Sequence, residues 1–459
     1  MEDILRHIAA HEADYLDELR AVVAIPSISS LSEHKPDMLK CAEHLADRFR
    51  AIGLEHVAVL PTEGHPAVYA DWLGAPGEPT ALLYGHYDVQ PVDPLHLWDS
   101  PPFEATIRGG DVFARGIADD KGQVMMHWAA LEAHLRTNGR LPMNVKLIIE
   151  GEEEIGSAHF GPFVARERER LAADVLVISD TSRFSRELPS LTYGLRGLVY
   201  IQIDLTCASH DLHSGSYGGG VGNPIEALAR VLASLRDEAG HVLVPGFYDD
   251  VQLISAAEKA ELARLPFDDA SFVAETGAPA THGEAGYSTL ERLWTRPTLD
   301  PNGIWGGFTG EGSKTVLPSR ASAKVSCRLV PDQDPDRIVA LLTAEIARLC
   351  PAWATVVVTK MDGGRPTVTA LDHPATIAAG RAIEAGFGKK PVFVRSGGSI
   401  PIVAVFRELL GTPVVLMGFA PPDDYAHAPN ERLDLAGFSA GIRSAAHLWP
   451  ELASALRQQ

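Results

Sequence analysis

The sequence predicts an α/β protein in which a mostly parallel sheet carries helices on both of its faces. Strand-like and helix-like segments alternate along the first part of the chain, and such alternation is typical of parallel sheets. "TALLYGHYDV" at 80–89 and "NVKLIIE" at 144–150 are largely apolar, as strands buried on both faces usually are. Between them, "DDKGQVMMHWAALEAHLRTNG" at 119–139 predicts a helix, with Asp at its start and Gly after its end.

The same alternation returns further along the chain. "ADVLVISD" at 173–180 and "TPVVLMGFA" at 412–420 predict two more apolar strands, and "AGFSAGIRSAAHLWPELASALRQQ" at 436–459 predicts a helix. We therefore expect one discontinuous catalytic domain, made of residues 1–192 and 369–459.

Residues 193–368 show a different pattern and are expected to form a separate module inserted into this domain. Their segments follow the order strand, helix, strand, strand, helix, strand, which is the ferredoxin-like order. In sequence they are "GLVYIQIDLTC", "NPIEALARVLASLRDE", "NGIWGGF", "ASAKVSCRLV", "DPDRIVALLTAEIARLC" and "ATVVVTKM".

Composition and charge exclude several classes of protein. The chain has 459 residues, too many for one ordinary core, and no apolar run reaches the roughly 18 residues that span a bilayer. Its net charge of −20 argues against nucleic acid or an anionic membrane as a partner. The four cysteines lie far apart, without a CxxC pair, and the N-terminal helix lacks the regions of a signal peptide. We expect a cytoplasmic protein.

Acidic residues and histidines stand where the predicted strands end. His86 and Asp88 close one strand, Glu152–Glu154 follow the next, and Asp180 ends a third. In an open parallel sheet, ligands bind outside the carboxyl ends of the strands, so these side chains fall on one rim. Each alone has a plain structural explanation, such as a solvated turn, but their joint placement is hard to explain as independent accidents.

Asp119, in "GIADDKG", and His427, in "DYAHAPNE", complete this rim. So many carboxylates would repel one another strongly unless cations lay between them. Two histidines with several carboxylates and no cysteine favour zinc, with manganese as the alternative. Asp88 lies on the same side of its strand as His86 and can accept the second ring N–H of that histidine.

Taken together, these motifs resemble the two-metal peptidase family that holds carnosine-type dipeptidases, aminoacylases, carboxypeptidase G and succinyl-diaminopimelate desuccinylase. The similar stretches run in order from about residue 80 to 431, and "DLHSG" with "RLVP" resembles the dipeptidase branch. They are "GHYDVQP", "ARGIADDKG", "EGEEEIGS", "ISD", "DLHSGSYGG", "SRASAKVSCRLVP", "RSGGSIP" and "AHAPNE".

The resemblance implies two metal ions per subunit, bridged by Asp119. His86 and Asp180 would complete one metal site, and Glu154 and His427 the other. The fold it implies is that of a two-metal exopeptidase, with the insert serving as a lid and as the interface of a homodimer.

The resemblance also assigns roles in catalysis. Glu153 would be the general base and Asp88 the orienting acid, while His213 would reach into the neighbouring subunit's site and polarise the scissile carbonyl. A cis peptide is implied between Asp119 and Asp120.

The substrate's carboxylate would be held by Thr315, Arg328 and the turn at Gly398 and Ser399. One position departs from the pattern: Ser396 stands where the dipeptidases often have an acidic residue after the Arg of "RSGGSIP". If that acid holds the free amino group of the substrate, an N-acyl or otherwise blocked substrate stays open here.

We therefore expect hydrolysis of the amide bond in dipeptides or short peptides with a free C-terminal carboxylate, by a metal-bridged water and a glutamate base. The nearest alternative is an N-acyl-amino-acid deacylase or carboxypeptidase on the same scaffold. A remote alternative is a non-catalytic metal-binding assembly protein. No nucleophile elbow is predicted, because the GxSxG stretch "GFSAG" at 437–441 lies within the predicted helix 436–459.

Overall fold

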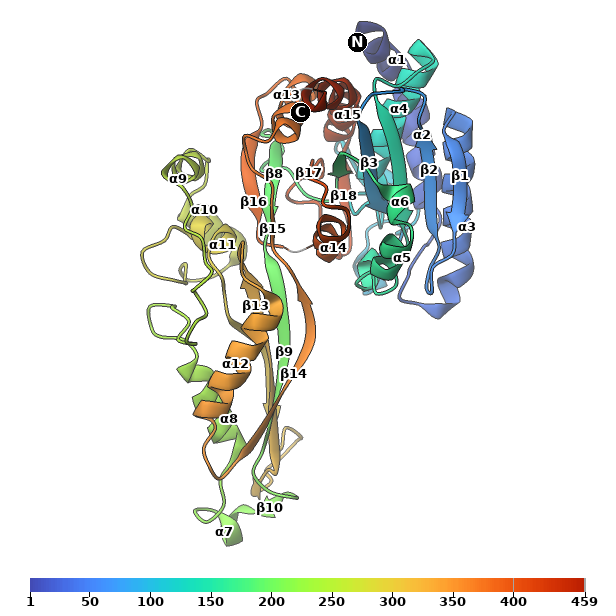
Figure 1. Ribbon diagram of the computed structural model, residues 1–459. Coiled ribbons are helices and arrows are strands. Elements are labelled where there is room, and N and C mark those ends of the chain that lie inside the picture. Colours follow the sequence, from blue (N-terminus) through green and yellow to red (C-terminus); the bar gives the residue numbers. More distant parts are fainter. Residues whose placement is uncertain (399, 458–459) are drawn as a thin grey trace. The chain divides into compact units, whose positions relative to one another are not determined.

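The computed structural model describes residues 1–398 and 400–457 and divides the chain into two compact units (Figure 1). Unit 1 consists of Met1–Tyr193, Thr369–Val394 and the C-terminal segment from Val405. Unit 2 consists of Gly194–Val368 and Arg395–Ala404. The predicted insert ended at residue 368, so the short second segment of unit 2 lies in what the sequence assigned to the catalytic domain.

Unit 1 is built on a mixed sheet whose central strands are parallel. Strands β6, β3, β7 and β17 run parallel to one another, whereas β1, β2, β8 and β15 outside them pair antiparallel. In the order β1-β2-β6-β3-β7-β17-β8-β15, with β16 beside β8, the strands are Glu55–Leu60, Ala67–Trp72, Asn144–Glu150, Thr80–His86, Val175–Ile178, Val414–Leu416, Ser190–Leu195, Thr367–Val368 and Val392–Ser396. The predicted α/β class is confirmed, but the sheet is mixed, because antiparallel pairs flank its four central parallel strands.

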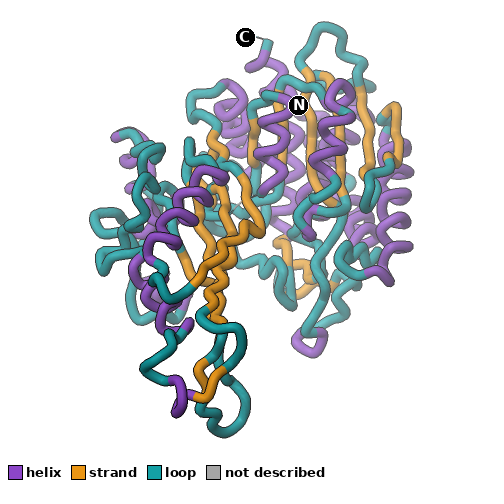
Figure 2. The backbone as a smooth tube through the Cα atoms, turned by 60° about the horizontal axis from the view of Figure 1, so that its bottom comes forward, coloured by secondary structure: helices purple, strands orange, loops and turns teal. Residues whose placement is uncertain are grey.

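Helices cover both faces of this sheet (Figure 2). On β3, Leu83 packs into the core formed with the larger helices, whereas Tyr84 points to the other face and contacts Phe160 and Phe406, with ring centroids 6.0 and 5.3 Å away. The first set of helices is α1 (Glu2–Ala10), α2 (Glu12–Val23), α3 (Lys35–Ile52), α4 (Lys121–Asn138), α13 (Pro374–Phe387) and α15 (Leu435–Leu456). The second includes α5 (Phe160–Arg166) and α14 (Pro401–Leu410), and α6 (Arg168–Leu171) follows α5.

Helix α4 begins and ends where the sequence predicted. Asp120 is its N-cap, and Gly139 ends it in the left-handed conformation, with φ of 66°. Within the described part of the chain, no helix combines the length and apolar character needed to cross a bilayer. A small antiparallel sheet, β18-β5-β4, lies beside these elements and is made of Arg432–Asp434, Asp111–Phe113 and Thr106–Arg108.

Unit 2 has the predicted ferredoxin-like order. Its antiparallel sheet, β11-β13-β9-β14, is made of Asp300–Gly306, Arg320–Leu329, Gly197–Thr206 and Thr355–Gly364. Helices α8 (Pro224–Ser234) and α12 (Pro335–Leu349) lie side by side against it (Figure 1). Alternate residues of β9, from Val199 to Leu205, are fully buried in the core shared with these helices.

The rest of unit 2 extends this frame. A two-stranded sheet pairs β10 (Leu212–His213) with β12 (Val316–Leu317), and α7 (Ser214–Tyr217) follows it. The long insertion forms α9 (Ala256–Ala263), α10 (Asp269–Thr276) and α11 (Thr289–Trp294). Arg395 forms an ion pair with Glu258 of α9, which explains physically why the segment 395–404 belongs to unit 2.

Candidate metal centre

Four neighbouring parallel strands of unit 1 end at one rim, and the predicted ligands stand there. His86 is the last residue of β3, and Asp180 follows β7 by two residues. Glu154 belongs to a short 3₁₀ turn, Glu153–Ile155, that follows β6. Asp119 precedes α4, and His427 lies in the loop between β17 and β18. The peptide bond between Asp119 and Asp120 is cis, as the resemblance implied.

The structure brings all five predicted ligands together in two groups that share Asp119. His86, Asp119 and Asp180 each offer a ligand atom within 4.8 Å of the others, and so do Asp119, Glu154 and His427. His86 Nε2 lies 3.0 Å from one carboxylate oxygen of Asp119, and His427 Nε2 lies 3.0 Å from the other. His427 Nε2 also lies 3.0 Å from Glu154 Oε2. One carboxylate therefore stands between two histidines.

The electrostatics of the rim show how crowded its charges are. Burial raises the pKa of Asp180 well above its usual value, and the charges of Asp119 and Asp120 raise it further. Hydrogen bonds with Asp119 and Glu154 raise the pKa of His427 to about 10. Two imidazoles and three carboxylates, arranged as two groups with one shared member, form the donor set of a dinuclear divalent site. The residues present thus fit a pair of cations.

Glu153 lies beside this donor set, at the start of the 3₁₀ turn that carries Glu154. Burial raises the pKa of Glu153 to about 7, with His86 acting in the opposite direction and the nearby Asp119 adding to the rise. A carboxylate with such a pKa can accept and release a proton near neutral pH, as a general base requires.

Asp88, which is fully buried, holds this turn in place. Its two carboxylate oxygens accept the backbone N–H groups of Glu153 and Glu154, at 3.2 and 3.1 Å. His86 Nδ1 lies 3.1 Å from the backbone carbonyl oxygen of Asp88 and 3.4 Å from its carboxylate. The predicted contact with the histidine ring is therefore shared with the backbone, and the link to the turn is an additional role.

Two further supports of the rim were missed in the sequence. Gln90 Nε2 donates to the carboxylate of Glu154 at 2.8 Å, and buried Glu431 accepts the backbone N–H of Asp119 at 3.1 Å. Gln90 lies in "GHYDVQP" and Glu431 in "AHAPNE". Both stretches are near predicted metal ligands, and this nearness could have indicated the two residues.

The predicted substrate residues belong to unit 2 and form two groups there. His213, at the end of β10, pairs with Val316, and the N–H of Ser214 donates to the carbonyl of Thr315 at 3.0 Å, so His213 and Thr315 lie together. Arg328 lies near the far end of β13, opposite Leu198. Ser399 lies outside the described residues.

Gly398 and Arg328 have a neighbour that the sequence did not single out. Arg196 donates from Nε to the carbonyl oxygen of Gly397 at 3.1 Å. Burial lowers the pKa of Arg196 to about 10, and the charge of Arg328 lowers it as well. The guanidinium group of Arg196 therefore lies beside the Gly397–Gly398 segment, within reach of the charge of Arg328.

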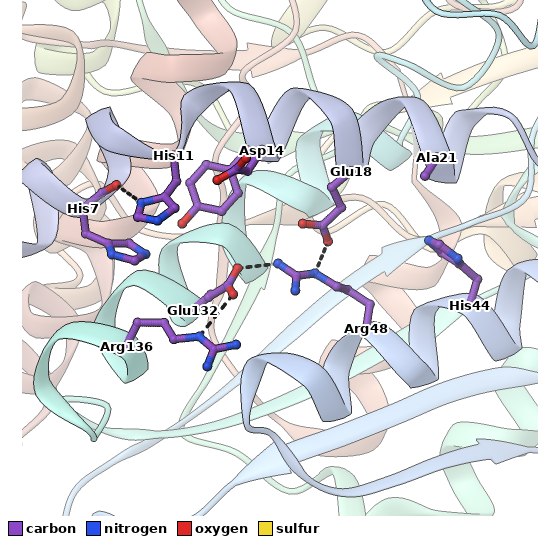
Figure 3. A pocket seen from close by; sticks show the side chains of 10 residues that line it. His7, His11, Asp14, Glu18, Ala21, His44, Arg48, Glu132 and Arg136 are labelled. Atoms are coloured by element: carbon purple, nitrogen blue, oxygen red, sulfur yellow. Dashed lines mark hydrogen bonds and ion pairs between the residues drawn. The ribbon is translucent and has the colours of Figure 1, made fainter.

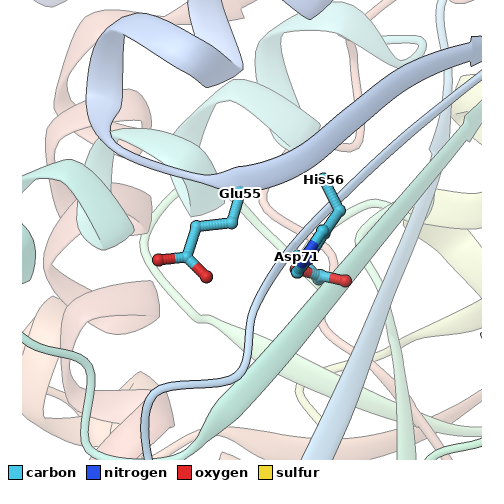
Figure 4. Close-up of side chains that lie close together, drawn as sticks. All are labelled: Glu55, His56 and Asp71. Carbon is cyan, nitrogen blue, oxygen red and sulfur yellow. The ribbon is translucent and has the colours of Figure 1, made fainter.

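A third group of potential ligands lies away from the rim, on β1 and β2. Figure 4 shows His56 reaching towards Asp71, beside Glu55. His56 Nδ1 lies 2.8 Å from one oxygen of Asp71, and Tyr69 donates its hydroxyl to the other at 2.9 Å. The hydrogen bond to Asp71 raises the pKa of His56. A structural ion pair accounts for this group.

A cavity of about 420 Å³ in unit 1 lies between α1, α2, α3 and α4 (Figure 3). Four of its charged side chains are paired with one another: Arg48 bridges Glu18 and Glu132, and Arg136 Nε lies 3.4 Å from Glu132. Since these charges are already balanced, the pocket gives no indication of chemistry.

The amino-acid sequence of this chain is similar to a known protein family and to characterised relatives. A family model described as "Peptidase family M20/M25/M40" matches residues 82–451. The "Cys-Gly metallodipeptidase dug1" of Schizosaccharomyces pombe is 31% identical over 456 residues, which cover 96% of this chain and 96% of that protein.

Two solved structures are similar along nearly the whole chain. Human carnosine dipeptidase 1 has a TM-score of 0.83 at 31% identity, with 99% of this chain and 98% of that chain covered. The metallo-carboxypeptidase Sso-CP2 of Sulfolobus solfataricus has a TM-score of 0.84 at 31% identity, with 96% and 99% covered.

Proposed function

The chain belongs to peptidase family M20/M25/M40, and from this premise we propose that it is a metallo-dipeptidase. Its substrates are dipeptides or short peptides with a free C-terminal carboxylate, and the reaction is hydrolysis of the amide bond. The observation that carries the proposal is the pair of three-ligand groups that share Asp119. Family membership confirms the resemblance of the motifs, and relatives named dipeptidases support the reaction.

In this proposal His86 with Asp180 would hold one divalent cation and Glu154 with His427 would hold a second, with Asp119 belonging to both groups. Zinc suits these donors best, and manganese is the alternative. When bound, such ions supply Lewis acidity, which lowers the pKa of water towards about 7 and polarises a carbonyl oxygen.

The side chains around the ions move the protons and orient the groups. Glu153 takes a proton from the attacking water and returns it to the leaving amine, which makes it base and then acid. Asp88 keeps Glu153 in place by accepting the N–H of its turn. No covalent intermediate with the protein is required.

Unit 2 supplies substrate recognition in this proposal. Arg328, Gly398 and Ser399 of one chain hold the carboxylate. Thr315 and His213, which lie together, serve the neighbouring subunit's site, where Thr315 also binds the carboxylate and His213 donates to the scissile carbonyl. Large apolar side chains exposed on unit 2 support a homodimer formed through it, because a partner subunit would cover them. They are Tyr217, Ile304, Trp305, Phe308, Trp353, Val357 and Met361.

A second candidate is a carboxypeptidase or an N-acyl-amino-acid deacylase on the same scaffold. Similarity to a metallo-carboxypeptidase supports the former, and Ser396 at the position after Arg395 supports the latter. The cytoplasmic location and the absence of nucleic-acid partners stay predictions from composition.

The test compares apo protein with protein reloaded with zinc or manganese, on a panel of carnosine, Cys-Gly, longer peptides and N-acetyl amino acids. We expect turnover only in the reloaded protein, and fastest on the dipeptides. Faster turnover of N-acetyl amino acids would assign a deacylase instead. No turnover on the panel, with both metals bound, would leave only the non-catalytic alternative.

A further inference from the structure

Glu431 is a fully buried carboxylate whose partners all belong to one segment of chain. Its Oε2 accepts Arg115 Nη1 at 2.7 Å and the N–H of Gly116 at 2.8 Å. Its Oε1 accepts the N–H groups of Ala118 and Asp119, at 2.9 and 3.1 Å. Each oxygen therefore has two donors, and the last of them is the backbone of the residue shared by both ligand groups.

Glu431 also belongs to the loop that carries His427. The N–H of Arg432 donates to the carbonyl of Asp424 at 2.8 Å and closes this loop, and the N–H of Ala114 donates to the carbonyl of Glu431 at 3.1 Å. Directly afterwards, β18 pairs with β5, so the His427 loop and the segment before Asp119 are joined at several points.

From these contacts we propose that Glu431 is a positioning residue for the metal centre, which fixes the backbone of Asp119 and ties it to the His427 loop. The inference rests on the proposed role of Asp119 and His427 as ligands. Glu431 itself would touch neither metal nor substrate. It would act by fixing the position of the Asp119 carboxylate, which both ligand groups share.

The chemistry of the Glu431–Arg115 ion pair indicates that Glu431 positions the backbone next to it and does not only stabilise the fold. Glu431 and Arg115 are both buried, with 0 and 1% of their surfaces exposed. A buried ion pair stabilises a protein poorly, because taking two charges out of water offsets most of their attraction. A carboxylate does, however, accept several N–H groups at fixed angles, and three of the four donors here are backbone groups of Gly116, Ala118 and Asp119.

The test separates the metal effect from the charge effect with four variants of the full chain. Glu431→Gln replaces one acceptor oxygen with an NH2 donor, so the N–H donors on that side lose their acceptor, and it leaves Arg115 without its countercharge. Arg115→Met keeps the three backbone contacts of Glu431. The double variant, with both changes, has no unpaired charge but still lacks the lost acceptor oxygen. Asp434→Asn is the matched control, because Asp434 forms a buried ion pair with Arg183 and caps α15 instead.

Zinc affinity is measured by titrating each apo variant with Zn²⁺ against a competing chelator, and stability by thermal unfolding of the same samples. Loss of a group that orients a metal ligand typically lowers metal affinity by about 10–100-fold. We expect this loss in Glu431→Gln and in the double variant, even where the double variant regains melting temperature. Arg115→Met and Asp434→Asn should melt earlier and bind zinc nearly as the wild type does.

The Co²⁺-substituted proteins provide a second readout, because their visible absorption reports the geometry of the ligands. A shifted spectrum in the double variant, with an unchanged one in Asp434→Asn, supports the positioning role. Wild-type zinc affinity and an unchanged cobalt spectrum in the double variant would overturn it. A wild-type chain that binds fewer than two zinc ions would instead overturn the proposed metal centre, so the two failures are distinguishable.

Discussion

The carboxylate of Asp88 accepts the backbone N–H of Glu154 at 3.1 Å, across 66 residues of chain. Through its other oxygen it accepts the N–H of Glu153, and its own backbone carbonyl lies 3.1 Å from the ring of His86. One residue at the end of β3 thus arranges a proposed base and two proposed ligands. This explains why the strand ends with His and Asp two positions apart.

The first prediction concerns Asp88→Asn, which keeps the shape of the side chain but offers only one acceptor oxygen. One N–H of the Glu153–Glu154 turn then loses its partner, so we expect zinc affinity to fall by about 10–100-fold and kcat to fall with it. Asp71→Asn is the matched control, since Asp71 is equally buried in unit 1 but pairs with His56. Equal zinc affinity in the two variants would contradict the role of Asp88.

The second prediction separates the base from the ligands. Glu153→Gln removes the proton carrier and keeps the five ligand side chains, so two metals should still bind while most of kcat is lost. Elemental analysis and steady-state kinetics on the same sample check this. Turnover near that of the wild type, in protein with its full metal content, would exclude Glu153 as the base.

Much of this site could be predicted because its signals are local. The apolar runs of β3, β6, β7 and β17 predict buried strands, and the carboxyl ends of parallel strands meet at one rim, so His86 and Asp180 could be placed together. Asp120 and Gly139 marked the ends of α4 in the same local way.

The remaining features depend on contacts between distant parts of the chain. Glu431 meets Asp119 across 312 residues, and no spacing or periodicity records such a contact. The edge strands β1 and β2 are short and pair antiparallel, so they lack the alternation with helices that predicts parallel strands. The segment 395–404 joins unit 2 through Arg395 and Glu258, side chains whose pairing no local pattern shows.

The third prediction tests recognition of the substrate's carboxylate. Arg328→Ala should raise KM about tenfold to a hundredfold for a dipeptide with a free C-terminus, because a charge-assisted hydrogen bond contributes roughly 1.5–3 kcal/mol. The amidated dipeptide lacks the charge partner and should be affected much less. An equal loss on both substrates would make Arg328 a structural residue.

The fourth prediction concerns acid stability. Burial lowers the pKa of His127 to about 3, and its Nε2 lies 2.6 Å from Ser179 Oγ. The folded pKa lies below the unfolded value, so as the pH falls the unfolded chain takes up this proton first. The contribution of neutral His127 to the free energy of unfolding is therefore complete above about pH 6.5 and is lost progressively as the pH falls towards 3.

Denaturant unfolding in the presence of a chelator checks this for the wild type and for His127→Gln. Between about pH 7.5 and about pH 5, the wild type should lose about 2 kcal/mol more than the variant, because only the wild type carries this linkage. Other groups titrate alike in both proteins and cancel in the difference. If both proteins lose the same stability, His127 does not resist protonation in the folded state.

The fifth prediction concerns His213, and it starts from a distance inside unit 2. The ladder of β13 with β9 is continuous from Arg320 to Arg328, which is about 27 Å at about 3.4 Å per residue. His213 lies beyond the Arg320 end, where Asp211 accepts the N–H of Ser319 at 2.9 Å. A dipeptide spans only about 7 Å, so one copy of unit 2 cannot bring both Arg328 and His213 to the same substrate.

A twofold dimer resolves this, because each site can then take Arg328 from its own chain and His213 from the partner. His213→Ala and Glu153→Gln should each be inactive alone. In a mixed dimer both defects fall on one site, and the other keeps its own Glu153 and receives an intact His213. With random pairing, about half of the dimers are mixed and one of their two sites is active, so co-expression should restore activity to about a quarter of the wild type. If His213 served its own chain, every site in the mixture would carry one defect, and verified mixed dimers would stay inactive.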